Sequence, residues 1–202
     1  YLGQTKDDIP HGFGLIFYDG YRYKGEISDG LPNGIGMEEG YYHSFIGEYK
    51  DGFPIKGYLR KNNILQKNVI HYVGELKMDL RHGYGFLVID STTEIPQTSQ
   101  TFGGEYLPVI TKKIITENPI YFGSFENNEH TTGAMHWPDG AVYMGEFAHG
   151  GLRDGFGKMT EPNGVESLGF FKDGVRNGRV NLLVPDKGSA WLTFCNDQII
   201  DD

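Results

Sequence analysis

The side chains most able to do chemistry in this 202-residue sequence are its histidines and its single cysteine, Cys195. His130 and His136 are six residues apart with no cysteine or paired carboxylates, which is poor spacing for a metal site. His11 and His82 each precede a Gly-x-Gly segment, where a polar turn residue is expected. Cys195 follows an apolar segment with no histidine nearby, so we interpret it as a packed side chain.

Sequence motifs of nucleotide-binding and hydrolytic enzymes are not matched. Gly157-Lys158 resembles the end of a P-loop, but Met159 stands where that loop needs Ser or Thr. The chain contains no Gly-x-Ser-x-Gly. Repeated glutamates on neighbouring strand pairs would lie about 10 Å apart, too far to chelate one ion. We therefore predict no enzyme, no cofactor and no metal, with the glutamates accepting hydrogen bonds from neighbouring backbone or hydroxyl groups: Glu26, Glu48, Glu75, Glu105 and Glu146.

The charge and composition exclude several kinds of partner. A formal net charge of −9 argues against nucleic acid, whose binding needs clustered Lys and Arg. The only basic cluster, Lys112-Lys113, is a pair, which argues against direct membrane binding. No apolar run approaches the length of a membrane-spanning helix. With one cysteine and no Asn-x-Ser/Thr sequon, we expect a cytoplasmic location.

One short phrase recurs along most of the chain. Tyr-x-Gly-Glu is followed by an aliphatic or aromatic residue, then by a turn pair such as Asp29-Gly30, then by Gly-x-Gly. We predict about eight units of roughly 23 residues over residues 1–180, starting near 1, 23, 45, 72, 102, 121, 143 and 167. The residues expected to build the units are Tyr23, Gly25, Glu26, Gly47, Glu48, Tyr72, Gly74, Glu75, Gly83, Gly85, Tyr143, Gly145, Glu146, Gly155 and Gly157.

Each unit reads as a β-hairpin. Tyr at i, Gly at i+2 and the bulky residue at i+4 share one face of a strand, because side chains alternate with period two. Glycines at this density would destabilise a helix by about 1 kcal/mol each, and glycine on a strand leaves room for an aromatic ring across the backbone. We predict an all-β fold, an elongated single-layer twisted meander of consecutive hairpins.

These motifs resemble the membrane occupation and recognition nexus (MORN) repeat, over about residues 1–180. The unit from Phe102 departs from the pattern because it lacks Gly-x-Gly, and residues 89–119 read as an irregular insert. Residues 181–202 read as a closing hairpin with an acidic tail.

A second apolar set lies between or beside the paired glycines and belongs to the opposite face. Because a single-layer sheet cannot cover both faces, this set either binds a partner or stacks locally. Trp137, beside a predicted turn, is a further anchor candidate. The candidate partner-binding residues are Phe13, Ile35, Tyr58, Tyr84, Trp137 and Phe156.

The resemblance implies a non-catalytic scaffold or spacer that docks an elongated protein partner in a cytoskeletal or ciliary (axonemal) assembly. Two alternatives stay open: a membrane or phosphoinositide adaptor, and the targeting region of a larger enzyme. Exposed terminal hairpins could also pair two copies into a homodimer.

Overall fold

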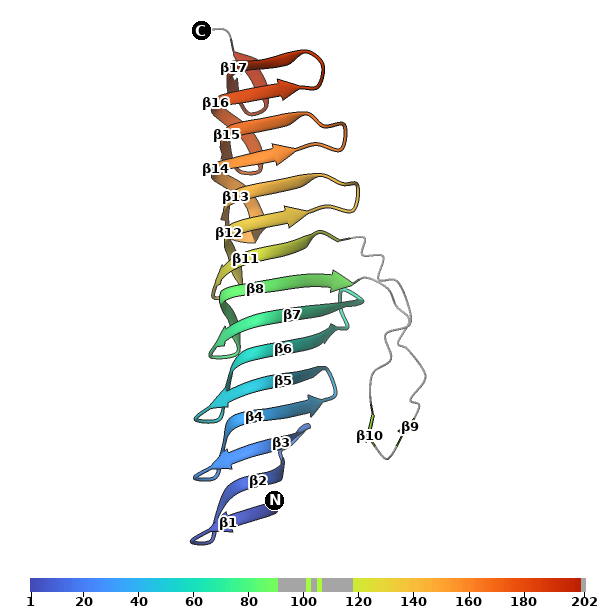
Figure 1. Ribbon diagram of the computed structural model, residues 1–202, viewed down its shortest axis with the longest axis vertical. Coiled ribbons are helices and arrows are strands. Elements are labelled where there is room, and N and C mark those ends of the chain that lie inside the picture. Colours follow the sequence, from blue (N-terminus) through green and yellow to red (C-terminus); the bar gives the residue numbers. More distant parts are fainter. Residues whose placement is uncertain (91–100, 103–104, 107–117, 201–202) are drawn as a thin grey trace.

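The computed structural model describes residues 1–90, 101–102, 105–106 and 118–200. Sixteen of its strands form one sheet in which each strand pairs antiparallel with the next one in the order. Figure 1 shows a long stack of hairpins with the two termini at opposite ends. This confirms the predicted all-β, elongated meander of hairpins.

The N-terminal half of the sheet contains β1 (Leu2–Lys6), β2 (Ile9–Phe17), β3 (Tyr21–Ser28), β4 (Leu31–Gly40), β5 (His43–Lys50), β6 (Phe53–Asn63), β7 (Asn68–Lys77) and β8 (Leu80–Asp90). The C-terminal half contains β11 (Ile120–Glu126), β12 (Glu129–His136), β13 (Val142–Ala148), β14 (Leu152–Thr160), β15 (Glu166–Lys172), β16 (Val175–Val184), β17 (Gly188–Cys195) and β18 (Gln198–Ile200).

Two-residue turns close the hairpins at one side of the sheet. Asp29-Gly30, Asp51-Gly52 and Asp173-Gly174 each have two consecutive positive φ angles, as the tight turns between twisted strands require. Between β13 and β14 a 3₁₀ turn, His149–Gly151, replaces this pair and also uses glycines with positive φ. The turn chemistry that fixes strand register is thus local in the sequence.

A continuous row of glycines crosses the sheet. Gly25 pairs with both Gly14 and Gly36, Gly36 with Gly47, and the row continues strand by strand to Gly169. Residues from the two sides of this row line the same cleft, as Phe45 and Leu76 do. The sheet is therefore bent along the row into two arms, with an inner face between them and an outer face outside.

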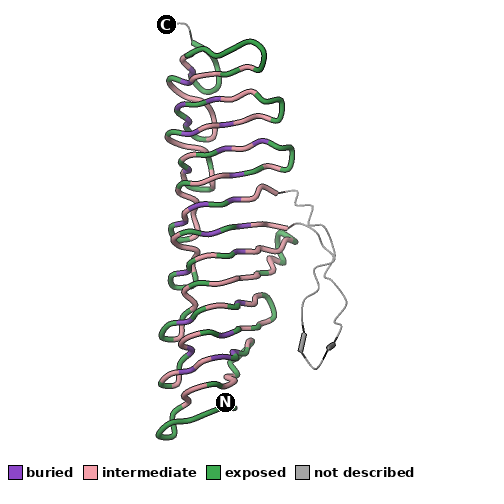
Figure 2. Tube along the Cα trace, viewed as in Figure 1, coloured by how far each residue is buried: buried purple, intermediate pink, exposed green. Residues whose placement is uncertain are grey.

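Head tyrosines explain why the row must be glycine. Tyr23 is fully buried on the inner face, and its ring lies over Gly25 and Gly36, where a Cβ would overlap it. Its hydroxyl donates a 2.7 Å hydrogen bond to the carbonyl of Glu26. Tyr72, Tyr121 and Tyr143 repeat this bond three residues ahead, at 2.8, 2.9 and 3.1 Å. Figure 2 shows such buried positions recurring along the stack.

The repeated glutamates stabilise the neighbouring strand. Glu26 Oε1 accepts from the backbone N–H of Ile35 at 3.2 Å, beside Gly34, whose φ is +106°. Glu146 does the same for Phe156 at 3.2 Å, and Glu75 for Tyr84 at 3.4 Å. The carboxylate therefore caps the irregular backbone at the first glycine of Gly-x-Gly. No such bond of Glu48 is among those of the described residues, and the side chain of Glu105 lies outside them.

Of the unit predicted to begin at Phe102, the strands within the described residues lie outside the large sheet. β8 pairs directly with β11, with Gly85 opposite Gly123, so the glycine row passes from one to the other without a break. β9 (Thr101–Phe102) and β10 (Glu105–Tyr106) form a separate two-stranded pair. The pair Lys112-Lys113 lies outside the described residues.

At the C-terminal end a small residue replaces the head tyrosine and a larger residue replaces a glycine of the row. Ser167 stands in the place of the head tyrosine, and Val180 in the place of the next ladder glycine, opposite Gly169. Both are buried, so the valine side chain occupies space that a tyrosine ring covers elsewhere. β17 and β18 follow as the last hairpin, and residues 201–202 of the predicted acidic tail lie outside the described residues.

Candidate interaction surface

The outer face carries an apolar row directly beside the glycines. Met37 is opposite Ile46, Ile46 opposite Tyr58, Val73 opposite Phe86 and Phe86 opposite Phe122. We call it the central row, and its members are Met37, Ile46, Tyr58, Val73, Phe86, Phe122, Ala134 and Met144. Lys24 and Lys158 occupy the next positions at its two ends.

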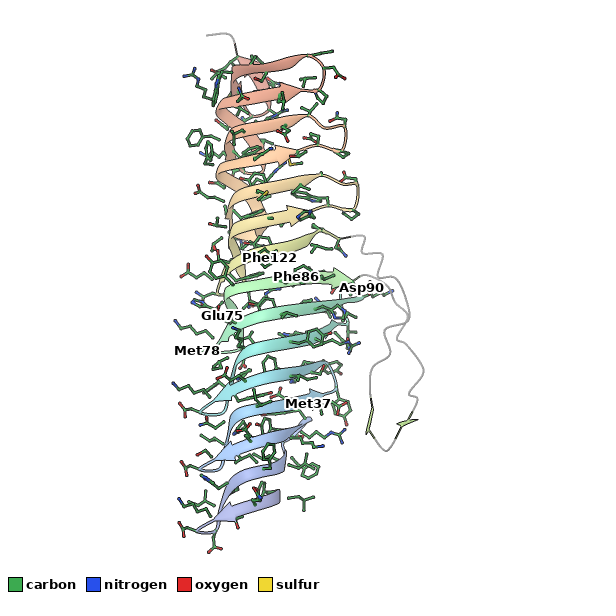
Figure 3. All side chains as sticks on the ribbon, in the orientation of Figure 1. Met37, Glu75, Met78, Phe86, Asp90 and Phe122 are labelled. Atoms are coloured by element: carbon green, nitrogen blue, oxygen red, sulfur yellow. The ribbon has the colours of Figure 1, made fainter. Side chains whose placement is uncertain are left out.

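Six of the eight apolar residues of the central row are exposed, and the other two, Tyr58 and Ala134, are half-buried. Phe122 is 60% and Met144 59% exposed, and Phe86 is 40% exposed. Met37, Phe86 and Phe122 can be found in Figure 3, on strands spread along the stack. Eight consecutive strands thus present cross-strand apolar neighbours without a charged residue among them. An exposed apolar strip of this length is typical of an interaction site.

Four of the residues predicted to bind a partner flank this row on the same face. Phe13, Ile35, Tyr84 and Phe156 are exposed, and each lies two residues before a position in line with the central row. They are not cross-strand neighbours of one another: Ile35 lies opposite Glu48 and Tyr84 opposite Ser124. They therefore form separate points along one side of the central row.

The other two predicted residues are placed differently. Tyr58 belongs to the central row itself, where its hydroxyl is 2.7 Å from His71 Nδ1. Trp137 packs against the buried cluster of the inner face, and the guanidinium carbon of Arg153 lies 6.0 Å from its ring. The structure thus places Tyr58, half-buried, in the central row and separates Trp137 from that row.

Most residues of the central row were not predicted from the sequence, because they occupy positions that vary between the repeat units. Ile46, Val73 and Phe122 are the x of Tyr-x-Gly or Phe-x-Gly, and Met37 and Phe86 follow the last glycine of Gly-x-Gly. Recurrent apolar residues at x were a usable signal, because x alternates with the buried tyrosine and must face outward.

The inner face is an aromatic stack. Tyr72, Phe125 and Tyr121 pack edge to face with ring centroids 5.3 and 5.0 Å apart, and Tyr121 and Phe147 continue the stack at 5.4 Å. The head tyrosine of one hairpin thus packs on the phenylalanine of the next hairpin, two residues after its glycine, as Tyr72 does on Phe125. Edge-to-face packing is a preferred geometry for aromatic pairs. It stabilises the fold beyond the contribution of the apolar area that the rings bury.

Arginines lie across this stack from β8 onward along the sheet. The guanidinium carbon of Arg81 is 5.5 Å from the Phe125 ring, that of Arg153 is 5.6 Å from Phe171, and that of Arg176 is 4.7 Å from Phe194. Burial and desolvation lower the pKa of Arg81. Each of the three arginines comes from the second position of a return strand.

His130 occupies the same register position in β12 and should make stability depend on pH. Burial among Tyr121 and Phe125, with Arg81 nearby, lowers its pKa to about 4. Between about pH 6.5 and 4 the unfolded chain binds a proton at His130 that the folded chain does not. The free energy of unfolding should therefore fall as the pH falls through this window.

The measurement is the urea midpoint of His130→Gln and of the unsubstituted chain at pH 7 and pH 5. The substitution should reduce the loss of stability between these values, because the group that takes up the proton is gone. His136→Gln, at an exposed histidine at the end of the same strand, is the matched control. Equal pH dependence in all three proteins would contradict the prediction.

Among the described residues no three His, Cys, Asp or Glu side chains gather in a way that could hold a metal ion. The described part of the chain also has no helix with the length and hydropathy to span a membrane.

The bent sheet, the tyrosine-covered glycine row and the glutamate caps define a hairpin-repeat protein. The family model of the MORN repeat matches residues 23–41, 72–91, 121–142 and 143–166. These segments begin at the head tyrosines Tyr23, Tyr72, Tyr121 and Tyr143. The chain therefore carries MORN repeats at these four positions, as its motifs predicted. A search of curated proteins finds no match. MORN repeats indicate a protein-interaction or membrane-associated repeat protein, of a kind that is typically non-catalytic.

Proposed function

We propose that this protein is a non-catalytic scaffold that docks an elongated protein partner along the central row. The observation that carries the proposal is the uninterrupted apolar row across eight strands, in which six of the eight residues are exposed. Neighbouring strands lie about 4.8 Å apart, so an extended or helical segment would meet apolar contacts at regular intervals. Individually weak contacts then add through multivalency.

The charge of the chain favours a neutral or basic partner. The net charge is −9, and such a partner would associate faster at low salt. A cytoskeletal or ciliary assembly as the setting rests on the resemblance to other MORN-repeat proteins. The membrane-adaptor alternative has less support, because anionic lipid surfaces attract clustered Lys and Arg.

The test is quantitative capture of proteins by the tagged chain and by Phe86→Ser/Phe122→Ser, which replaces two opposite residues of the central row. Loss of these two aromatic side chains should weaken binding of the main captured partner by about 2 kcal/mol or more, the scale of interface hot spots. The fold should be unchanged, because both side chains are exposed on the outer face.

Tyr41→Ser/Tyr42→Ser is the matched control. These two exposed aromatic residues lie at the turn between β4 and β5. If both double variants bind the partner like the unsubstituted chain, the central row is not the docking surface. If instead vesicles with phosphoinositide bind the chain at physiological salt and no protein does, the membrane alternative replaces the proposal.

A further inference from the structure

A cleft of about 400 Å³ lies on the inner face of the N-terminal half, opposite to the surface that carries the central row. Glu38, His43 and Lys61 contribute to one wall, and His43 Nε2 contacts Glu38 Oε1. Pro54, Leu76 and Asp79 contribute to the other wall. The cleft therefore lies between the two arms of the bent sheet, and its walls hold two carboxylates.

Strand register relates this cleft to three places where the chain inserts an arginine. Arg81 lies opposite Leu76, Arg153 opposite Phe147 and Arg176 opposite Phe171, at the start of a return strand. Pro54 lies opposite Tyr49 in the same register. Proline thus stands where three later hairpins have arginine and where the β11–β12 hairpin has His130.

Each of the three arginines reaches the turn of the next hairpin. Arg81 donates to the carbonyl of Asn128 at 3.1 Å, and Arg153 donates to that of Gly174. Arg176 Nε donates to Asp197 Oδ1 at 2.7 Å. The guanidinium is therefore held between an inner-face ring and a turn oxygen.

The hairpin after Pro54 offers the matching groups without an arginine. Leu76 corresponds to the ring positions Phe125 and Phe171, and Asp79 corresponds to Asp197 as the second residue of its turn. Asp79 and Asp197 have nearly the same φ, +62° and +64°. Among the described residues no ion pair involves Asp79. Its carboxylate therefore resembles that of Asp197 with the arginine removed.

The electrostatics of the cleft favour a cation. The hydroxyl of Tyr49 is buried and has no hydrogen-bond partner among the described residues. Burial raises its pKa first, and the nearby carboxylates of Glu38 and Asp79 raise it further. Among the lining residues Lys61 supplies one ammonium group against these two carboxylates, and Asp79, unlike Glu38, has no cationic partner among the described residues.

We propose that this cleft binds the guanidinium of an arginine side chain from a partner polypeptide. The guanidinium takes the position that Arg81, Arg153 and Arg176 fill from within the chain, with Asp79 as its main acceptor. Arg is suited to the site because its planar fork combines ring packing with hydrogen bonds to carboxylate and carbonyl oxygens. The site is on the other face from the central row and does not depend on the function proposed above.

The probe is the pentapeptide acetyl-Gly-Ser-Arg-Ser-Gly-amide, titrated into the ¹⁵N-labelled chain and followed by NMR. We expect saturable shifts of amide signals around Gly52, Leu76 and Asp79. The same peptide with citrulline, which is a neutral isostere of arginine, should give none. Shifts from both peptides alike, or shifts spread over the outer face, would overturn the proposal.

Two variants make the test specific. Asp79→Asn should weaken peptide binding about tenfold, since it removes the charged partner of the guanidinium. Asp186→Asn makes the same change in another exposed turn, at the same φ of +62°, and should leave the affinity unchanged. Equal affinity of the two variants would contradict the assignment of Asp79.

Pro54→Arg should abolish peptide binding, because the new side chain fills the cleft from within as Arg81 does in its own hairpin. Circular dichroism checks that it folds, and Asp79→Asn decides the matter if it does not. Methylguanidinium is the last arm of the titration. If it binds as tightly as the pentapeptide, the site recognises a small cation and the polypeptide partner is ruled out.

Discussion

Tyr72→Ala is expected to lower the free energy of unfolding by about 3–5 kcal/mol, the range measured for removing large buried aromatic side chains. Tyr72 is fully buried, its ring covers Gly74 and Gly85, and its hydroxyl donates to the carbonyl of Glu75. The substitution leaves a cavity at the bend of the sheet and an unsatisfied carbonyl. Urea denaturation followed by circular dichroism measures the effect.

Tyr84→Ala is the matched control, because it removes the same side chain twelve residues later on the opposite face. Tyr84 is 70% exposed, so its loss should change stability by less than about 0.5 kcal/mol. If the two variants were equally stable, the inner-face tyrosines would not be the core of this fold.

Gly85→Ala should cost about 3 kcal/mol, an unusually large effect for adding one methyl group. The three atoms that a Cβ at Gly85 would meet first all belong to the Tyr72 ring, which must move or tilt. The comparison is Gly140→Ala, in a turn where the φ is +96° and no atom lies within 4 Å of the added Cβ. There only backbone strain of about 1 kcal/mol is expected.

A double variant separates the clash from a general effect on the strand. In the Tyr72→Ala background the ring is absent, so adding Gly85→Ala should cost less by about 1–2 kcal/mol. The free energies of unfolding of the four proteins give this coupling. An identical cost in both backgrounds would place the conflict somewhere other than between the ring and the glycine.

Much of this fold could be predicted because its rules act within one hairpin. The turn pair Asp29-Gly30 fixes register locally, and the spacing of Tyr23 and Gly25 fixes which face is buried. A head aromatic such as Phe102 does not by itself show whether its strand joins the large sheet, and β9 pairs only with β10. The direct pairing of Gly85 with Gly123 depends on residues far apart in the sequence.

The candidate site was less predictable than the fold. The outward direction of Phe13, Ile35 and Tyr84 followed from alternation along a strand, but the central row was hidden at positions that the repeat leaves variable. The inner cleft required the register between different hairpins, since Pro54 and Asp79 belong to different units. The pattern of a single unit does not show that Pro54 occupies the position that Arg81, Arg153 and Arg176 hold in other units.

The direct contact between β8 and β11 makes this sheet suited to grafting. Ile120 pairs with Val88, in register with the glycine pair Gly85 and Gly123 of the same two strands. The Asn118 side chain donates a hydrogen bond to the carbonyl of Ile89 at 3.2 Å. The end of β8 and the start of β11 are therefore held side by side by the pairing of these two strands. A foreign domain with adjacent termini could replace the intervening residues and be carried at a fixed height along the hairpin stack.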